Sequence, residues 1–532
     1  MKKFLLSLFS LLIPYITFAQ DMEEIGFDQK IDEAFEPVSS FFTEVIFFEI
    51  AGIPFVLVLL VASAAFFTLA FGFPNIRFFG KAINTVRGKY DDIEHHGLGD
   101  ERAAVDGDIR DTIRDESKEG EVSHFQALAT AVSGTVGNGN IAGVALAIAL
   151  GGPGATFWMI VCGLLGMSTK FVECTLGVQY RDVDENGTVY GGPMYYLSKG
   201  LKEKGFATLG KITAVLFAIF CIGGSFGGGN AAQSNQATIV IKELFSWEST
   251  GAGTLVGVVL AIIVGIIIIG GIKRIASVTE KVVPFMAVLY ILCCLYIIFS
   301  NYTFIDDAFG LIFTEAFNPK AIGVGSVIGV LLVGFQRAAF SNEAGAGSAS
   351  IAHSAVKTNY SASEGLVALL EPFIDTVVIC TMTALVIIIF NFGGFFEYGD
   401  ATGAGVVIID GVSYEGAGIT SKAFAEYIPY SKVFLTIAVV LFAVSTMISW
   451  SYYGLQSWKY LFGRGKRADL IYKVLFCVFV VIGAAASMDS IWAFSDAMIF
   501  AMVFPNMIGL YFLFPVVKKQ LRRYLDAIKL AR

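Results

Sequence analysis

Long apolar segments alternate with short polar ones over most of this 532-residue chain. Each apolar segment has about 20 residues or more, which is the length that a helix needs to cross the hydrocarbon core of a bilayer. One such segment covers 45–72, and ten more follow residue 124. The ten predicted spans are 125–149, 152–180, 211–245, 253–272, 282–301, 322–345, 362–391, 427–462, 469–488 and 490–517. The pattern predicts an all-α polytopic membrane protein.

The residues before the ten spans predict four further segments. Lys2, Lys3, the apolar run 4–16 and the residues before Gln20 are typical of a secretory signal peptide over 1–19. An uncleaved first membrane anchor is the alternative, although the run is short for a span. The segments expected after it are an acidic periplasmic tail over 20–44, an extra transmembrane helix over 45–72 and a charged cytoplasmic loop over 73–124.

The composition is that of a membrane protein, and the distribution of charged residues predicts its orientation in the membrane. Charged residues make up 15% of the chain, against about 25% in a typical soluble domain, so the pattern excludes an ordinary soluble globule. Lys and Arg concentrate in alternate loops and in the tail over 518–532, whereas the other loops are acidic. Because basic loops face the cytoplasm, the ten helices are expected to begin and end there. We therefore expect a multi-pass protein of the bacterial cytoplasmic (inner) membrane.

Two of the ten predicted spans are interrupted by glycine-rich polar residues. The first break covers 133–143 in the first span, and the second covers 334–348 in the sixth. These are corresponding positions in two five-helix repeats, 125–301 and 322–517, joined by an outer connection over 302–321. Since five is odd, the second repeat is inverted relative to the first, which is typical of secondary transporters with a site near the midplane. For each glycine cluster alone, close helix packing is the alternative.

Six separated segments carry a family resemblance. They are TVGNGNIAG (135–143), GGPGATFWM (151–159), GGPMYY (191–196), GIKRIA (271–276), FSNEAG (340–345) and WSYYG (450–454). Together they resemble the alanine or glycine:cation symporter family, of the sodium:alanine symporter type. The resemblance implies a leucine-transporter-like fold of the amino acid-polyamine-cation superfamily, import of a small neutral amino acid and coupling that is usually to Na⁺. The chain departs from the family at Asn138, where threonine is more frequent, and at Ala346, where leucine is usual.

A zwitterionic substrate needs donors for its carboxylate and acceptors for its ammonium group. Backbone amides of 137–139 open a half-helix, whose dipole favours an anion, and carbonyls near Phe340 and Ser341 are candidate acceptors. The resemblance implies that Gln233 contacts the substrate, with an interhelical hydrogen bond as the alternative, and that Trp450 narrows the pocket. The predicted substrate-binding residues are Thr135, Gly137, Asn138, Gly139, Asn140, Gln233, Phe340, Ser341 and Trp450.

A hard monovalent cation needs oxygen ligands. By analogy with the leucine-transporter fold, the hydroxyl groups of Ser445 and Thr446 are expected to join carbonyls near Ser133 and Val136 in a Na⁺ site. The alternative is that both hydroxyl groups bond to carbonyls of their own helix.

Four carboxylates fall inside predicted spans, where charge is rare and usually functional. They are Glu343, Glu371, Asp375 and Asp496. For Glu343 we consider pairing with Arg337 or a part in coupling. Glu371 and Asp375 lie one helical turn apart, and a hydrogen-bonded structural pair is one interpretation. If one of the two exchanges protons, H⁺ is the coupling ion.

The sequence therefore predicts a symporter that imports alanine or glycine with Na⁺ as coupling ion, by alternating access. Its expected partners are the amino acid, Na⁺ and the lipid bilayer, without nucleic acid. The alternatives are a proton-coupled carrier, a carrier of D-alanine or another small amino acid, a channel, and a membrane-embedded enzyme. An enzyme is least expected, because the seven cysteines form no paired motif and the four histidines form no His-Glu-x-x-His arrangement.

Overall fold

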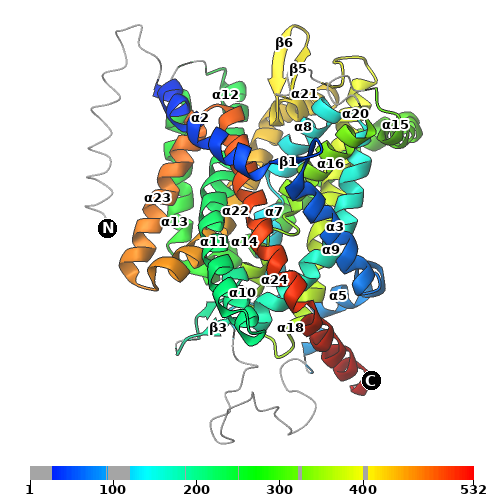
Figure 1. The fold of residues 1–532 in the computed structure, drawn as a ribbon. Coiled ribbons are helices and arrows are strands. Elements are labelled where there is room, and N and C mark those ends of the chain that lie inside the picture. The colour runs from blue at the N-terminus through cyan, green and yellow to red at the C-terminus, as the bar shows by residue number, and fades with distance from the viewer. Residues whose placement is uncertain are drawn as a thin grey trace, which may run out of the picture.

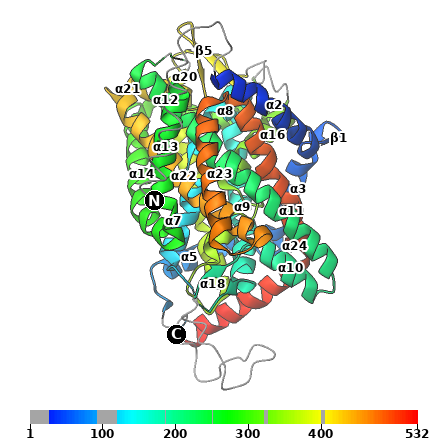
Figure 2. The same ribbon diagram turned by 90° about the vertical axis from the view of Figure 1, so that its left-hand side faces the viewer.

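The computed structural model describes residues 27–91, 93, 120–185, 187–247, 249, 251–320, 326–399 and 405–531. The predicted signal peptide over 1–19, the start of the predicted periplasmic tail and most of the charged loop over 73–124 lie outside the described residues. The described part is built of upright helices that lie side by side in one bundle (Figure 1; Figure 2).

The ten predicted spans all appear as helices or helix pairs. Among the described residues, seven helices are long and apolar enough to cross a membrane, and the bent pair α7–α8 adds an eighth span. These eight are α7 (His124–Thr135) with α8 (Ala142–Gly151), α9 (Gly154–Gln179), α11 (Ala207–Phe226) with α12 (Ala232–Phe245), α14 (Gly271–Ser300), α18 (Ser361–Ala368) through α19 (Leu370–Pro372) to α20 (Thr381–Asn391), α22 (Ser431–Phe462), α23 (Lys466–Ala485) and α24 (Met488–Leu530). The other two predicted spans correspond to shorter apolar helices, α13 (Ala252–Ile268) and α16 (Val327–Asn342), and α16 is followed by α17 (Ala349–His353).

Two spans contain π-helical segments that change the direction of their side chains. Segment η4 (Gly227–Ala231) joins α11 to α12, and segment η6 (Phe373–Cys380) joins α19 to α20. Such π-helical segments are rare and are frequently found at functional sites. Segment η6 lies next to the first break, because η3 (Asn138–Asn140) contacts η6 directly, and η3 also contacts α12, the helix that follows η4.

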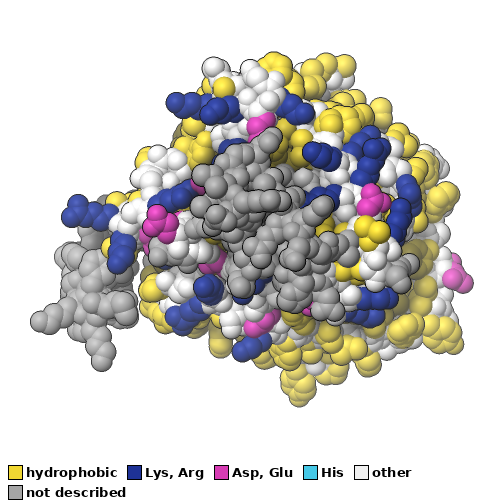
Figure 3. Space-filling model, turned by 90° about the horizontal axis from the view of Figure 1, so that it is seen from below, with side chains coloured by type: hydrophobic (Ala, Val, Ile, Leu, Met, Phe, Trp, Pro, Cys, Tyr) yellow, Lys and Arg dark blue, Asp and Glu magenta, His cyan; other side chains and the backbone are white. Residues whose placement is uncertain are grey.

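The loops at the two ends of the bundle differ in structure and charge. One end carries the hairpin β5 (Val406–Ile409) and β6 (Val412–Glu415), α21 (Ala417–Tyr427) and α15 (Ile305–Phe317). The other carries α10 (Pro193–Glu203), the hairpin β3 (Asp182–Val183) and β4 (Val189–Tyr190), and the end of α24 (Figure 1). Figure 3 shows Lys and Arg side chains spread over this second end, which is the end that the positive-inside rule assigns to the cytoplasm.

The N-terminal part differs from its sequence prediction. Instead of one helix over 45–72, the chain forms α2 (Phe27–Ile46), a short hairpin of β1 (Glu49–Ile50) and β2 (Ile53–Pro54), and then α3 (Phe55–Ala70). The hairpin turns at Ala51 and Gly52, both of which have left-handed backbone angles. At 16 residues α3 is about 24 Å long. It packs on α9, where Thr68 Oγ1 donates to Ser168 Oγ over 2.8 Å.

Two other segments predicted as connections or tails are helical. The outer connection over 302–321 contains η5 (Tyr302–Phe304) and α15. The tail over 518–532 continues α24 as far as Leu530. It is held by Tyr524, whose ring centroid lies 6.3 Å from that of Tyr90 and 5.5 Å from that of Tyr360. The short helices α4 (Pro74–Arg77) and α5 (Phe79–Val86) follow α3 on the same side.

Candidate functional site

The first break is a short extended segment between α7 and α8. The helix α7 ends at Thr135, Gly137 has extended backbone angles (φ −144°, ψ −152°), and the two helices meet at a bend of 56°. Gly137 is required here because a Cβ atom would lie 2.4 Å from Thr446 Oγ1. The interruption at Gly137 therefore lies directly against Thr446 of α22.

The second break results from three left-handed residues. Glu343, Gly345 and Gly347 have φ angles of 55°, 98° and 87°, which end α16 at Asn342. Glycine adopts such angles without strain, but glutamate does so at a cost. A strained residue of this kind is a candidate for function, and Glu343 is the only one of the three with a side chain.

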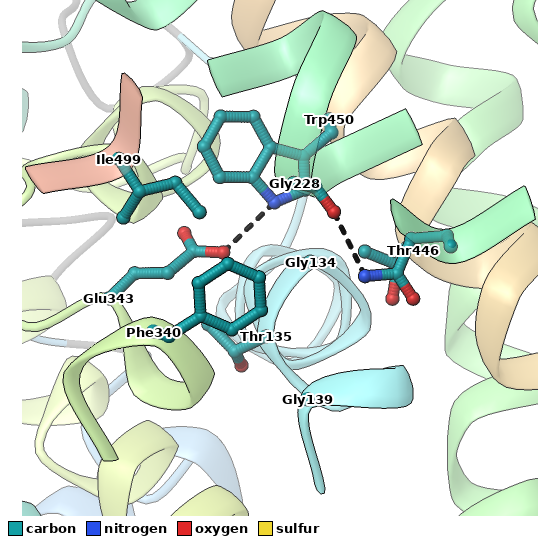
Figure 4. A pocket seen from close by; sticks show the side chains of 10 residues that line it. Gly134, Thr135, Gly139, Gly228, Phe340, Glu343, Thr446, Trp450 and Ile499 are labelled. Carbon is teal, nitrogen blue, oxygen red and sulfur yellow. Dashed lines mark hydrogen bonds between the residues drawn. The ribbon is translucent and has the colours of Figure 1, made fainter. Parts of the chain in front are cut away.

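The two breaks face each other across a small cavity (Figure 4). A Cβ atom on Gly139 would lie 3.4 Å from Ser341 Cα, which shows how closely the two segments approach. The residues that line the cavity are Gly134, Thr135, Gly139, Gly228, Gln233, Phe340, Glu343, Thr446, Trp450 and Ile499. Six of them belong to the predicted substrate or cation residues, while Gly134, Gly228, Glu343 and Ile499 do not.

Glu343 places a carboxylate in the cavity wall. Trp450 Nε1 donates to Glu343 Oε1 over 2.9 Å, and Ser348 Oγ donates to the other oxygen. The side chain does not pair with Arg337, as one interpretation of the sequence had it, because Arg337 bonds to Asp496 of α24. Arg337 lies one turn before Phe340 in α16 and is turned toward α24 by the helix. Among the described residues, no basic side chain forms an ion pair with Glu343, so its carboxylate is available to a cationic group.

Two of the three amides proposed for a substrate carboxylate are bonded within the protein. Gly137 N–H donates to Asn140 Oδ1 over 2.8 Å, and Asn138 N–H donates to Gln233 Oε1 over 3.0 Å. The amides of Gly137 and Asn138 therefore fix the shape of the break, and Gly139 is the residue of the three that borders the cavity.

Gln233 combines both roles considered for it. It lines the cavity, and its Nε2 donates to the carbonyl of Gly228 in η4 over 2.9 Å. Asn138, the residue that departs from the family pattern, donates from Nδ2 to the Gln233 carbonyl over 3.2 Å. Asn138 therefore acts from behind the cavity wall and holds α12 against the break.

Asn140 and Ser341 are directed away from the cavity toward a shared carboxylate. Asn140 Nδ2 donates to Asp375 Oδ1 over 2.7 Å, and Ser341 Oγ donates to Asp375 Oδ2 over 2.9 Å. Thr376 Oγ1 also donates to Asp375 Oδ2, over 2.7 Å. Asp375 lies in η6 and is completely buried. One side chain therefore ties both breaks to the same helix.

The predicted cation residues are brought together, with different roles for the two hydroxyl groups. Thr446 Oγ1 donates to the Ser133 carbonyl over 3.0 Å, and Ser133 Oγ donates to the Ser445 carbonyl over 2.7 Å. The Ser445 hydroxyl instead donates to Phe442 of its own helix over 2.9 Å. Val136 is buried beside Gly137, at the end of α7. The Thr446 hydroxyl thus contacts the first broken helix, whereas the Ser445 hydroxyl bonds within its own helix, which is the alternative considered from the sequence.

Glu371 and Asp375 do not form the pair suggested by their spacing. Glu371 pairs with Lys170 of α9, at 2.9 Å between Oε1 and Nζ, and Asp375 bonds to the breaks. The π-helical turn of η6 separates their directions. We overlooked Lys170 in the sequence, although a lysine inside an apolar span is itself a signal. Among the described residues, no group of three or more His, Cys, Asp or Glu side chains is arranged to hold a metal ion.

Comparison with known proteins adds a family and a fold. A model of the sodium:alanine symporter family matches residues 39–531. The sodium/alanine symporter AgcS of Methanococcus maripaludis is 40% identical over 473 residues, covering 88% of this chain and 94% of that protein. The amino-acid carrier protein AlsT of Bacillus subtilis is 31% identical over 468 residues, covering 88% of each. The crystal structure of MhsT in complex with L-phenylalanine matches with a TM-score of 0.50 at 16% identity, covering 77% of this chain and 100% of MhsT, and shows the leucine-transporter-like fold.

Proposed function

The chain belongs to the sodium:alanine symporter family, and we propose that it imports alanine or glycine together with Na⁺ by alternating access. Family membership makes it a multi-pass membrane transporter that carries an amino acid with a cation, and not an enzyme. It also confirms the resemblance found in the sequence. The inverted symmetry of the two five-helix repeats stays a prediction.

The cavity supports an amino acid as substrate, because it offers an acid to the ammonium end of a zwitterion and an N–H donor to the carboxylate end. The Glu343 carboxylate is an acceptor for an ammonium group, and the Gly139 amide is a donor for a carboxylate. The two groups come from different broken helices, so that a substrate of the right length bridges them. The presence of Glu343 from the second break and Gly139 from the first in one cavity wall is the observation that supports the proposal most directly.

The size of the cavity favours a short side chain. Phe340, Trp450 and Ile499 form its apolar walls. Gly228 also lines it, and a Cβ atom there would lie 2.6 Å from Ile499 Cδ1, which leaves no room for a bulkier wall. Each methylene group changes discrimination by about 1–3 kcal/mol. Alanine and glycine are therefore both substrates in our proposal, while larger side chains are rejected.

Sodium is the cation that we assign to the junction of α7 and α22. Thr446 Oγ1 and the Ser133 carbonyl approach within 3.0 Å there, and both are neutral oxygen donors of the kind that hard cations take. The junction lies at the C-terminal end of α7, and the negative pole of a helix dipole at that end favours a cation. Inward movement of one charge through 100 mV releases about 2.3 kcal/mol, which drives accumulation.

Uptake by the purified protein in proteoliposomes tests this proposal. We expect accumulation of radiolabelled L-alanine and glycine when Na⁺ is high outside, and little when choline replaces Na⁺ at constant pH. Leucine and glutamine are expected to compete poorly. Undiminished accumulation in choline excludes Na⁺ coupling, and absence of uptake of every small amino acid tested excludes the proposed substrate class.

We also propose the bacterial cytoplasmic membrane as the location, with the face in Figure 3 inside the cell. The basic residues of that face support this orientation. Single cysteines at Lys466, on that face, and at Asp410, in the β5–β6 hairpin, test it with a membrane-impermeant thiol reagent. Labelling of position 410 but not 466 in intact cells is expected, and the reverse result contradicts the orientation.

A further inference from the structure

Helices α3 and α24 lie side by side as they approach the end of the bundle that Figure 3 shows. The ring centroid of Phe66 lies 5.3 Å from that of Tyr511 and 5.5 Å from that of Phe514. One turn beyond Phe514, the Nζ atom of Lys518 lies 5.7 Å from the centroid of the Phe71 ring. The last turn of α3 therefore lies beside the part of α24 that carries Lys518, and α24 then continues below the bundle (Figure 1).

The chain turns sharply where α3 ends. Gly72 and Phe73 have left-handed backbone angles, with φ of 64° and 57°. The Phe73 amide donates to the Thr68 carbonyl over 2.8 Å and the Gly72 amide to the Leu69 carbonyl over 3.0 Å, which is the bonding pattern of a Schellman cap. A left-handed phenylalanine is strained, and 47% of the Phe73 surface is exposed. The strained turn therefore places an aromatic side chain on the surface directly before α4.

Along both segments, exposed apolar side chains are followed by basic ones. The exposed apolar side chains are Leu69, Phe73, Ile76, Tyr511 and Phe512. Among the basic side chains that come after them, we call the following four the basic surface: Arg77, Lys81, Lys518 and Arg522. A membrane protein shows this order where its chain passes from the hydrocarbon core into the headgroup layer. The basic surface is therefore expected at the level of the lipid phosphate groups.

An aromatic ring and a carbonyl group hold two of these cations. Arg77 Cζ and Lys81 Nζ each lie 5.3 Å from the centroid of the Phe78 ring, which is a favourable place for a cation. Arg77 Nη1 also donates to the Gly72 carbonyl over 3.5 Å. Gly72 directly follows the phenylalanine whose ring lies beneath Lys518. The cations of α4, α5 and α24 therefore border one area of the surface.

The end of α24 is held in place by α5. Tyr524 Oη lies 3.2 Å from Thr85 Oγ1, and Leu521 is buried. Lys518 and Arg522 are four residues apart and therefore lie on one face of α24. The contact with α5 thus keeps this face next to the cations of α4 and α5.

The basic surface differs from other cations at this end in its charge balance. None of its four side chains forms an ion pair with a residue that the structure describes. By contrast, Lys199 and Arg464 share the carboxylate of Asp182, at 2.7 and 2.9 Å. Four like charges without acidic partners repel one another, and an anion bound among them relieves that repulsion.

We propose that the basic surface binds the headgroup of an anionic phospholipid. The cations receive the phosphate group, and the acyl chains lie along the exposed Phe73 and Ile76. A lipid fits this surface because it brings a phosphate group and acyl chains together, whereas a soluble anion covers only the cations. The inference goes beyond the proposed transport and holds whichever amino acid the protein carries.

Native mass spectrometry of the delipidated full chain in detergent tests the proposal. Phosphatidylglycerol and phosphatidylcholine with identical acyl chains are added in turn. We expect phosphatidylglycerol to stay bound at collision energies that remove phosphatidylcholine, and to raise the apparent melting temperature more. Equal retention of the two lipids overturns the proposal, because acyl chains alone then account for binding. Displacement of phosphatidylglycerol by an equal concentration of glycerol 3-phosphate also overturns it, since the surface then takes a soluble anion.

Uncharged variants locate the site. The test variant combines Arg77→Gln, Lys81→Gln, Lys518→Gln and Arg522→Gln. The control variant removes four exposed charges elsewhere at the same end and combines Lys202→Gln, Lys204→Gln, Lys466→Gln and Arg467→Gln. We expect the affinity for phosphatidylglycerol to fall about tenfold in the test variant and to be retained in the control. Unchanged affinity in the test variant, or an equal loss in the control, overturns the assignment.

Two pairwise variants serve as the test if the fourfold variant does not fold. Arg77→Gln with Lys81→Gln alters only α4 and α5, and Lys518→Gln with Arg522→Gln alters only α24. Because the two pairs border the same headgroup, each is expected to weaken the binding of phosphatidylglycerol and to leave that of phosphatidylcholine unchanged. Full affinity for phosphatidylglycerol in both pairwise variants overturns the site.

Discussion

Asn140 and Asp375, which are 235 residues apart in sequence, are joined by a hydrogen bond of 2.7 Å from Asn140 Nδ2 to Asp375 Oδ1. The Oδ1 atom of the same asparagine accepts from the Gly137 amide. Asp375 therefore acts on the first break through Asn140, and on the second through Ser341. It is a positioning residue: it fixes the two segments between which the proposed substrate lies.

The substitution Asp375→Asn tests this role. The amide keeps one acceptor oxygen but turns an N–H₂ group toward the donors of Asn140, Ser341 or Thr376. Leaving one buried donor unpaired costs about 1–3 kcal/mol, so we expect the KM for alanine to rise about tenfold, which is about 1.4 kcal/mol. Alanine uptake in proteoliposomes measures it. Asp410→Asn, at a side chain that is 70% exposed, is the control with unchanged uptake, and an equally unaffected Asp375→Asn contradicts the role.

The two glycines of the first break are expected to differ in what they tolerate. A Cβ atom on Gly139 meets Phe340 and Ser341 at ordinary contact distances of 3.4 Å or more, whereas one on Gly137 lies 2.4 Å from Thr446 Oγ1. We therefore expect Gly139→Ala to retain uptake, Gly139→Val to abolish it by filling the substrate space, and Gly137→Ala to impair it. Uptake is normalised to the amount of protein in the membrane. Normal uptake by Gly139→Val contradicts the placement of the substrate.

The hydroxyl groups of Thr446 and Ser445 are expected to contribute unequally to Na⁺ dependence. Thr446 donates across to the Ser133 carbonyl, while Ser445 bonds within its own helix. Thr446→Ala is therefore expected to raise the Na⁺ concentration for half-maximal uptake by about tenfold, and Ser445→Ala by much less. Thr446→Ser keeps the hydroxyl group and is the matched control. Equal Na⁺ curves for the alanine and serine variants remove Thr446 from the cation site.

Trp450 is expected to act through its ring nitrogen as well as its bulk. The Nε1–H group holds Glu343 Oε1 at 2.9 Å. Trp450→Phe keeps an aromatic wall but removes this donor, so Glu343 loses its orientation toward the ammonium group. We expect a higher KM for alanine with little change in the ranking of substrates. The outcome that contradicts this role is an unchanged KM with a new preference for larger amino acids, which assigns Trp450 to size alone.

Loss of one partner of the buried Lys170–Glu371 pair is expected to harm stability more than loss of both. Lys170→Met leaves the Glu371 carboxylate without its closest cation, at a cost of about 3–5 kcal/mol. Adding Glu371→Leu removes the unpaired charge, and we expect it to restore most of the apparent melting temperature in detergent. Lys199→Met breaks the half-exposed pair with Asp182 and serves as control, with a change of about 1 kcal/mol or less. If the double variant melts below Lys170→Met, the pair itself is required.

The sequence by itself determined the spans, the two breaks and the family. Apolar length and helix-breaking residues are local properties, so α9, α14 and α22 can be read directly from the chain, as can the interruptions at Gly137 and Glu343. The N-terminal helix was misplaced because apolar residues continue through the hairpin before Phe55, and only the left-handed angles of Ala51 and Gly52 end the pattern.

Only the tertiary structure decided which side chain faces which. The rotation of each helix about its axis follows from packing against distant segments, and that rotation turns Glu343 into the cavity and Asn140 away from it. The same packing separates Glu371 from Asp375 through the π-helical turn of η6 and brings Lys170 to Glu371 from 201 residues away. A sequence lists the charges inside a membrane, but the fold decides how they pair.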